Sequence, residues 1–137
     1  MIRVGIDLGD VRIGVAVSDE LGIVASPRCV IQSSGWTNDI QRISAIVSEV
    51  DAGEVVVGLP KNMDGSIGPR ARKATEFAER LEQALGIPVV MWDERLSTVQ
   101  ASKALLEADM SRRKRRGVVD KAAASLILQS YLDLKSR

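Results

Sequence analysis

Asp7 is the first residue in this sequence whose type and surroundings could carry chemistry. It lies in the pattern of residues 4–8, which predicts a strand, and alternation places it on the same face as Gly5. The matching face of the next predicted strand carries only small residues, namely Gly14, Ala16 and Ser18. An acid beside so little side-chain volume leaves room for a closely packed helix or a ligand. Capping of the turn at Gly9 is the alternative role for Asp7.

Two further acidic positions could join Asp7. Asp120 begins a stripe on the last predicted helix, which continues through Ala123, Ala124, Ile127 and Tyr131. This spacing turns Asp120 toward the sheet, whereas an acid that only stabilised the helix dipole would face water. The pair Asp93-Glu94 follows a buried strand, and ligands gather at the carboxyl ends of parallel strands. Glu94 has the longer side chain and is the preferred candidate. Two alternatives stay open: the pair is merely a solvated strand end, or Asp93 assists Glu94.

Three carboxylates in one place point to a divalent cation. Two charges about 4 Å apart repel by roughly 4 kcal/mol at an effective dielectric of about 20, so the cluster needs protons, bases or a cation. Oxygen ligands favour one or two Mg²⁺ or Mn²⁺ ions over zinc, and such ions support phosphodiester hydrolysis. We therefore predict that Asp7, Glu94 and Asp120 are catalytic residues and metal ligands that converge within about 4–8 Å.

Composition excludes several other kinds of chemistry. The chain of 137 residues contains no histidine and one cysteine, Cys29. These counts exclude Ser-His-Asp and Cys-His catalysis, histidine zinc sites and an internal disulfide. The length predicts a single domain, residues 1–137, and the formal net charge of +1 does not indicate a partner. Without a signal peptide or a long apolar stretch, we expect a cytoplasmic protein that does not interact with membranes.

The order of predicted elements is three strands, a helix, a strand, a helix, a strand and two helices. Short connections require the first three strands to form an antiparallel meander, with Pro27 on an edge strand. The strands are predicted at residues 4–8, 13–17, 23–31, 54–59 and 88–92. The helices are predicted at residues 38–50, 74–85 with Gly86 as the stop, 97–108 and 118–134. The fold class is α/β, with a mixed five-stranded sheet of three antiparallel and then two parallel strands, and helices on both faces.

Basic residues near the acids are candidates for contacts with nucleic-acid phosphates. The strongest feature is an unbroken run four residues before Asp120, composed of Arg112, Arg113, Lys114, Arg115 and Arg116. Because like charges repel, we expect this run to be a flexible loop that orders on nucleic acid; a merely solvated loop is the alternative. Further candidates are Arg12, Lys61, Asn62, Arg70, Arg72 and Arg95. The segment 65–69 beside them is expected to be mobile, or else an ordinary surface loop.

The motifs resemble those of the YqgF family, also called RuvX. The matching segments cover most of the chain: Gly5-Ile6-Asp7-Leu8-Gly9, residues 12–19, 57–66, 93–98, 120–124 and 127–132. The resemblance implies a ribonuclease H-like fold related to Holliday-junction resolvases, and a nuclease that processes precursor 16S ribosomal RNA. It also implies catalytic acids at Asp7, Glu94 and Asp120. The dipeptide Asp10-Val11 departs from the small or basic residues of many members and leaves local substrate contacts open.

Other functions fit the same residues. The main alternative is a Holliday-junction resolvase acting on DNA. A nucleic-acid-binding factor without catalysis would explain the basic run equally well. An actin-like ATP-binding domain could use Asp7-Leu8-Gly9 as a phosphate turn, although such proteins need two domains. The sequence does not distinguish an RNA from a DNA substrate, or a monomer from a homodimer. It also leaves open the cleavage preference and association with ribosomal precursor particles. Aromatic residues are few, so recognition of backbone and shape is expected to dominate over base stacking.

Overall fold

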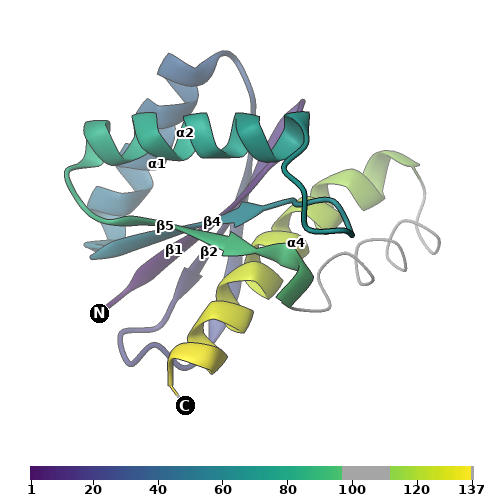
Figure 1. The fold of residues 1–137 in the computed structure, drawn as a ribbon. Helices are drawn as coiled ribbons and strands as arrows, with labels where there is room; N and C mark the ends of the chain where they lie inside the picture. Colours follow the sequence, from purple (N-terminus) through teal and green to yellow (C-terminus); the bar gives the residue numbers. More distant parts are fainter. Residues whose placement is uncertain (97–111, 137) are drawn as a thin grey trace.

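The computed structural model describes residues 1–96 and 112–136, with side chains in the second segment described from residue 122 onward (Figure 1). Its centre is a five-stranded sheet in the order β3-β2-β1-β4-β5. The strands are β1 (Arg3–Leu8), β2 (Arg12–Ser18), β3 (Ala25–Gln32), β4 (Glu54–Leu59) and β5 (Val89–Asp93). Strands β1, β2 and β3 pair antiparallel, whereas β4 runs parallel to both β1 and β5. The predicted mixed sheet is confirmed.

Helices cover both faces of this sheet, as predicted. Helices α1 (Trp36–Val50) and α2 (Pro69–Leu85) lie on one face, and α4 (Arg112–Lys135) lies on the other (Figure 1). A short 3₁₀ turn, η1 (Glu94–Leu96), follows β5 directly. Gly86 ends α2 in the left-handed conformation with φ 70°, which confirms it as the stop. The helix predicted at residues 97–108 lies outside the described residues.

The hairpin between β1 and β2 depends on Gly9. The amide of Gly9 donates to the carbonyl of Arg12 over 2.9 Å. A Cβ at Gly9 would stand 2.5 Å from that carbonyl oxygen, so no other residue fits without movement of the backbone. At the other side of the meander, Pro27 lies on edge strand β3 at a register shift opposite Val15 and Ala16, as predicted.

The small-residue face of β1 and β2 is the surface on which α4 packs. Gly5 pairs with Ala16 and Asp7 with Gly14, so the two predicted faces coincide. A Cβ at Gly5 would stand 2.8 Å from the Cβ of Leu128 and 3.0 Å from the carbonyl oxygen of Ala124. The backbone of α4 therefore approaches the sheet more closely than side chains on β1 would allow.

A second core lies between the sheet and helices α1 and α2. Its members are almost all aliphatic, and the largest fully buried ones include Ile6, Ile13, Ile43, Val57, Phe77 and Leu81. Phe77 meets Trp36 edge-on, with ring centroids 5.4 Å apart, and so joins the two helices. This packing fixes one face of the sheet and leaves the other to α4.

A buried carboxylate anchors α4 at the amino-terminal end of β4. The Tyr131 hydroxyl of α4 donates to Glu54 over 2.9 Å, and Arg3 Nε donates to the same oxygen over 2.7 Å. Lys135 lies 3.8 Å from the second carboxylate oxygen. Because the charge of Glu54 is matched in this way, its burial does not leave an isolated ion. The contact sets the position of α4 along the sheet.

The prediction that residues 112–116 form a loop is wrong, because α4 begins at Arg112. Lys and Arg have favourable helix propensities, and a like-charge pair four residues apart costs a helix only about 0.2–0.5 kcal/mol. That repulsion is too small to unwind the first turns of a helix that continues for 24 residues. The basic run is therefore part of the helix that also contains Asp120.

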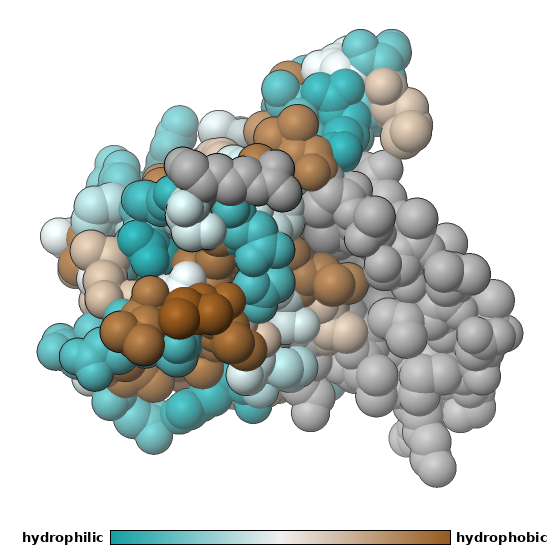
Figure 2. Space-filling view, turned by 90° about the horizontal axis from the view of Figure 1, so that it is seen from below, coloured by the Kyte–Doolittle hydropathy of each residue, from teal (hydrophilic) through white to brown (hydrophobic). Residues whose placement is uncertain are grey.

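Exposed apolar residues gather in the connection between β2 and β3. Leu21, Ile23 and Val24 are all more than half exposed there. Figure 2, which looks at the molecule from below Figure 1, shows brown atoms gathered among hydrophilic ones on this side. Within residues 1–96 and 112–136, none of the helices combines the length and the apolar character needed to cross a bilayer.

Candidate active site at the carboxyl ends of the strands

Asp7 lies near the carboxyl end of β1 and is only 5% exposed. It shares the face of Gly5, which α4 covers, since alternate residues of a strand point to the same side. On the neighbouring parallel strand, Val57 pairs with Ile6, and Gly58 is the next residue along. Asp7 is thus placed beside a residue that has no side chain of its own.

Glu94 reaches the same place from β5 through the turn η1. It is 2% exposed, and its Oε2 lies 3.2 Å from the point where a Cβ of Gly58 would stand. The Cδ1 of Ile127, from α4, lies 2.6 Å from that point. Glu94 and Ile127 therefore fill the space that a side chain at position 58 would take. Asp7 of β1 and Glu94 after β5 therefore lie at the same end of the sheet, on either side of the intervening strand β4.

The third predicted acid, Asp120, belongs to α4, but its side chain lies outside the described part of the chain. Ala123, Ala124 and Ile127, one to two turns further along α4, are fully buried against the sheet. Among the side chains that the structure describes, no group of three Asp, Glu, His or Cys residues is placed to hold a metal ion. Convergence of all three acids therefore stays a prediction. The structure describes the positions of two of them, Asp7 and Glu94, beside Gly58.

Asp93 faces away from this pair and binds Arg95. The guanidinium donates to Asp93 over 2.9 Å through Nη2 and over 3.3 Å through Nε. These hydrogen bonds hold the pKa of Asp93 below its ordinary value, although partial burial opposes them. Lys61 Nζ lies 4.0 Å away on the same side. The structure thus gives Asp93 a role in fixing Arg95, and the predicted phosphate contact of Arg95 stays a prediction.

The loop of residues 60–68 has a defined conformation next to this pair. The amide of Gly65 donates to the Asn62 carbonyl over 2.9 Å, and the Asn62 amide donates to Ser66 over 3.0 Å. Ser66 donates twice to Asp64, and these hydrogen bonds lower the pKa of the Asp64 carboxyl. Mobility of the segment 65–69 stays a prediction, which this hydrogen-bond network does not favour.

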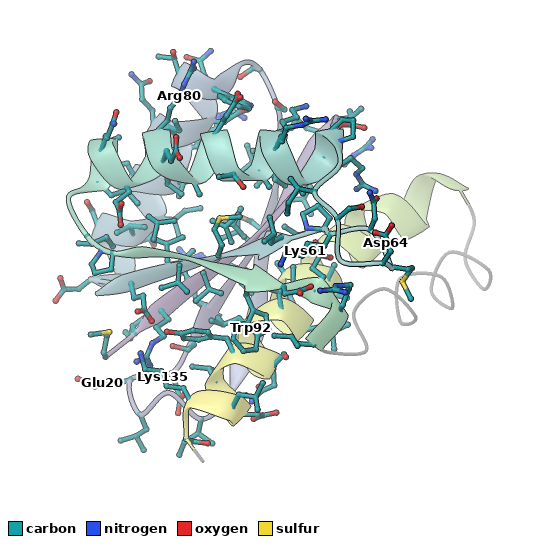
Figure 3. All side chains as sticks on the ribbon, viewed as in Figure 1. Glu20, Lys61, Asp64, Arg80, Trp92 and Lys135 are labelled. Carbon is teal, nitrogen blue, oxygen red and sulfur yellow. The ribbon has the colours of Figure 1, made fainter. Side chains whose placement is uncertain are left out.

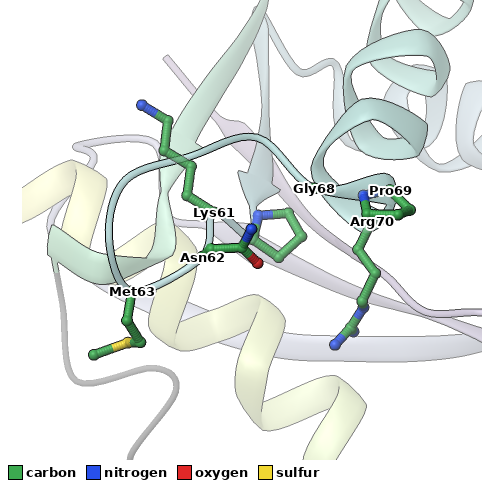
Figure 4. Close-up of a pocket in the computed structure, with 7 residues that line it drawn as sticks. Lys61, Asn62, Met63, Gly68, Pro69 and Arg70 are labelled. Carbon is green, nitrogen blue, oxygen red and sulfur yellow. The ribbon is translucent and has the colours of Figure 1, made fainter.

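Arg95 connects the loop to the strand end, because its Nη1 lies 3.5 Å from the Met63 carbonyl. Figure 3 shows Lys61 and Asp64 at this end of the sheet, far from Glu20 and Lys135 at the opposite end. The loop and the start of α2 enclose a hollow of about 400 Å³ (Figure 4). Its lining is Pro60, Lys61, Asn62, Met63, Gly68, Pro69 and Arg70.

The predicted nucleic-acid contacts are therefore distributed unevenly. Lys61, Asn62 and Arg70 line one hollow, whereas Arg72 is not part of that lining. Arg12 opens β2 at the same end of the sheet, in the hairpin that follows Asp7. In the same hairpin, Asp10 is 3.5 Å from Lys73 of α2. Asp10, which departs from the pattern of many family members, is thus paired with a base.

Sequence reasoning missed Gly58. Its signal is present in the sequence, since a glycine interrupts the apolar pattern Glu54-Val-Val-Val-Gly-Leu59 inside a strand. A glycine in a strand interior marks a bend or the close approach of another group. Here two groups approach, the carboxylate of Glu94 and the side chain of Ile127.

Comparison with known proteins identifies the family. The family model RuvX, described as Holliday junction resolvase, matches residues 1–134. A protein of Halothermothrix orenii named "Putative pre-16S rRNA nuclease" is 50% identical over 133 residues, which cover 97% of this chain and 95% of that protein. A protein of the same name from Pelotomaculum thermopropionicum is 52% identical over 134 residues, covering 97% of this chain and 87% of that protein.

Solved structures agree on the fold. RuvC of T. thermophilus in complex with a Holliday junction substrate has a TM-score of 0.62 at 14% identity, with 99% of this chain and 97% of that chain covered. The fowlpox virus resolvase bound to Holliday junction DNA has a TM-score of 0.55 at 13% identity, with both chains covered completely. At such identities the likeness shows a common fold, the resolvase-like variant of the ribonuclease H fold. Together with the family model and the relatives that are half identical, it shows that the chain is a nuclease of the RuvX family.

Proposed function

We propose that this chain is a divalent-metal-dependent endonuclease that processes precursor 16S ribosomal RNA in the cytoplasm, with Asp7, Glu94 and Asp120 as its catalytic acids. The observation that carries the proposal is the placement of two buried carboxylates, Asp7 and Glu94, on either side of Gly58. The relatives' name supplies the substrate. Residues 1–137 act as one nuclease domain.

The residues at this site fit Mg²⁺ or Mn²⁺. Both described acids are at least 95% buried at a strand end, and the chain has no histidine with which to build a zinc site. Carboxylate oxygens are the ligands that hard divalent cations prefer. Asp7, Glu94 and Asp120 would hold the ion or ions. When bound, they would stabilise the negative charge that develops on the phosphate during hydrolysis.

The protein's own residues have distinct parts in this proposal. Glu94 is held in place by its contact with Gly58 and by Asp93, which binds the next residue, Arg95. Ile127 packs against the same glycine and keeps water from the inner side of the acids. Lys61 and Arg70 are placed to bind backbone phosphates on the outer side, since both line the adjacent hollow.

A four-way DNA junction is the second candidate substrate. The matching family is described as Holliday junction resolvase, and two structures of the same fold are bound to such junctions. Phosphate contacts from Lys61, Arg70 and the basic start of α4 would serve either substrate, because they carry no sequence information. The closer relatives favour the RNA.

The test is cleavage by the purified protein with Mn²⁺ of two substrates, a 16S leader stem and a four-way junction. We expect endonucleolytic cuts in the RNA, and none with Asp7→Asn or Glu94→Gln. Cuts in the junction alone would transfer the proposal to the DNA substrate. Tight binding of both substrates without any cut would overturn it in favour of a non-catalytic binding factor.

A further inference from the structure

Exposed apolar side chains surround the end of the sheet that carries Asp7 and Glu94. They come from the β1–β2 hairpin, the 60–68 loop and the turn η1, and they are Val11, Met63, Ile67 and Leu96. Met63 is 80% exposed, the most of the four. Burial of these side chains against a ligand would remove apolar surface from water, which is favourable.

The backbone that carries Met63 is held on both sides. The turn around it is closed by the hydrogen bonds from Asn62 to Ser66 and from Gly65 to Asn62. Arg95 donates to the Met63 carbonyl and at the same time binds Asp93, the neighbour of Glu94. Met63 is therefore presented at a fixed place relative to the acids, and Figure 4 shows its side chain directed away from the loop.

All aromatic side chains of the chain are engaged elsewhere. The sequence contains two Trp, one Tyr and one Phe. Trp36 packs edge-on against Phe77, and Trp92 packs edge-on against Tyr131, each with centroids 5.4 Å apart. Each ring thus packs on another ring within the fold, and none comes from the 60–68 loop or from η1. A base contact at this site has to use an aliphatic or thioether side chain.

We propose that Met63 packs against a nucleobase next to the bond that is cut, and so selects substrates whose base is unpaired or easily unstacked there. This inference rests on the proposed function and names the specificity element of that site. Unbranched methionine adapts its shape, and its sulfur makes favourable contacts with aromatic rings. Apolar side chains such as Met, Leu and Ile insert between bases in proteins that kink nucleic acids.

Charge identifies the occupant as nucleic acid. Lys61 and Arg70 line the hollow that Met63 also lines, so a phosphate can be bound on either side of a base that meets Met63. An apolar surface for a protein partner would instead be expected to lack such charges at its centre. The combination of a thioether with flanking cations matches the alternation of base and phosphate along one strand.

The direct test uses RNA stems with 2-aminopurine at successive positions, with Ca²⁺ present so that binding is measured apart from cleavage. Wild type should raise the fluorescence at one position, because the base leaves its stack. Met63→Leu should keep this rise, and Met63→Ala should lose most of it at equal saturation. Leu21→Ala is the matched control, since Leu21 is also 80% exposed but lies in the β2–β3 connection. An equal rise with Met63→Ala, or binding by wild type without any rise, would overturn the inference.

Cleavage provides the second measurement. On a fully paired stem, Met63→Ala should lower kcat/KM on the order of tenfold, the scale of one lost base contact. On the same stem with one unpaired nucleotide at the cut, the loss should be small, because unstacking is no longer required. Equal losses on both stems would contradict the inference. A normal fluorescence rise without any cleavage by wild type would instead contradict the proposed nuclease function and leave the role of Met63 supported.

Discussion

The carboxylate of Glu94 occupies the place where Gly58 lacks a side chain, with Oε2 3.2 Å from the position of a Cβ. Ile127 of α4 meets the same position at 2.6 Å. One glycine in the sheet therefore controls both the acid from β5 and the approach of the helix that carries Asp120. Changes at Gly58 should therefore affect both the position of Glu94 and the packing of α4.

Gly58→Ala should abolish most of the cleavage activity and lower the free energy of unfolding by about 1–3 kcal/mol, the usual cost of one extra methyl group in a packed core. The new methyl group collides with Ile127 and displaces Glu94. Cleavage rates and thermal melting, measured on the same preparation, check both parts.

The double variant Gly58→Ala, Ile127→Val separates these two effects. Valine lacks the Cδ1 that collides, so stability should return toward that of the wild type. Activity should stay low, because the methyl group still presses on Glu94. Recovery of full activity in the double variant would show that helix packing alone, and not Glu94, is disturbed.

Asp7→Asn, Glu94→Gln and Asp120→Asn should each lower cleavage at least about a hundredfold while the fold is kept, as expected where charge stabilisation is removed from the transition state. In EDTA we expect melting temperatures equal to or above that of wild type, because each change removes a charge from a crowded site. Normal activity in Asp120→Asn would exclude that residue from the site and leave Asp7 and Glu94 as the acids.

Metal binding should be visible without any substrate. A ligand at a hundred times its Kd stabilises the folded state by about 2.7 kcal/mol, so Mn²⁺ should raise the melting temperature of the wild type. With either Mn²⁺ or Mg²⁺, the rise should vanish in Asp7→Asn. Higher salt should not restore it. A rise of the same size in Asp7→Asn and Glu94→Gln would place the ion elsewhere.

Much of the fold could be predicted from the sequence because its signals are local. Alternation gave the small face of β1 and β2, and the register pairs Gly5 with Ala16 as expected. The apolar run of residues 54–59 coincides with β4, and Gly86 ends α2. The predicted start of α4 at residue 118 is six residues too late, because the helix propensity of the preceding bases outweighs the repulsion among them.

The site was less predictable, because its contacts join segments that are distant in sequence. Nothing near Gly58 in the chain indicates that Glu94 and Ile127 will meet there. Likewise, side-chain length alone favours Glu94 over Asp93 as the catalytic acid, whereas the structure separates the two by their contacts: Asp93 binds Arg95, and Glu94 lies over Gly58. Pairing of this kind follows from the strand register, which a single sequence does not display.

The contact of Arg95 with Asp93 predicts a pH dependence. Hydrogen bonds from Arg95 lower the pKa of Asp93 from its ordinary value of 3.8. Because the pKa is lower in the folded state, this group stabilises the protein at pH values above its ordinary pKa. The stabilisation is lost as the pH falls through the folded-state pKa. Arg95→Gln should raise the pKa of Asp93 toward 3.8, measured by a carboxyl-carbon NMR titration.

Ser66→Ala is the matched control for that titration. It removes the hydroxyl hydrogen bond that contributes most to the lowered pKa of Asp64 and keeps the one from the backbone amide, so this pKa should rise while that of Asp93 stays low. If Arg95→Gln left the titration of Asp93 unchanged, the guanidinium contact would not exist in solution, and the anchoring of Met63 would lose its support.

The last prediction concerns the basic start of α4, residues 112–116. If all five bases contacted duplex phosphates, the log–log salt slope of binding would include about −4.5 from this segment, at roughly −0.9 per contact. Five helical residues make more than one turn, so we expect only two or three of them to reach one duplex, with a contribution of about −1.8 to −2.7. Replacing Arg112, Arg113 and Arg116 with Gln should reduce the slope magnitude by up to about 2.7 and weaken binding similarly for all sequences. The chemical step at saturating substrate should persist, because these bases position the backbone and do not hold the ions.

Arg42→Gln, in α1 on the opposite face of the sheet, should leave the slope unchanged. An unchanged slope in the triple variant would show that substrate approaches the acids from the side of Lys61 and Arg70 alone.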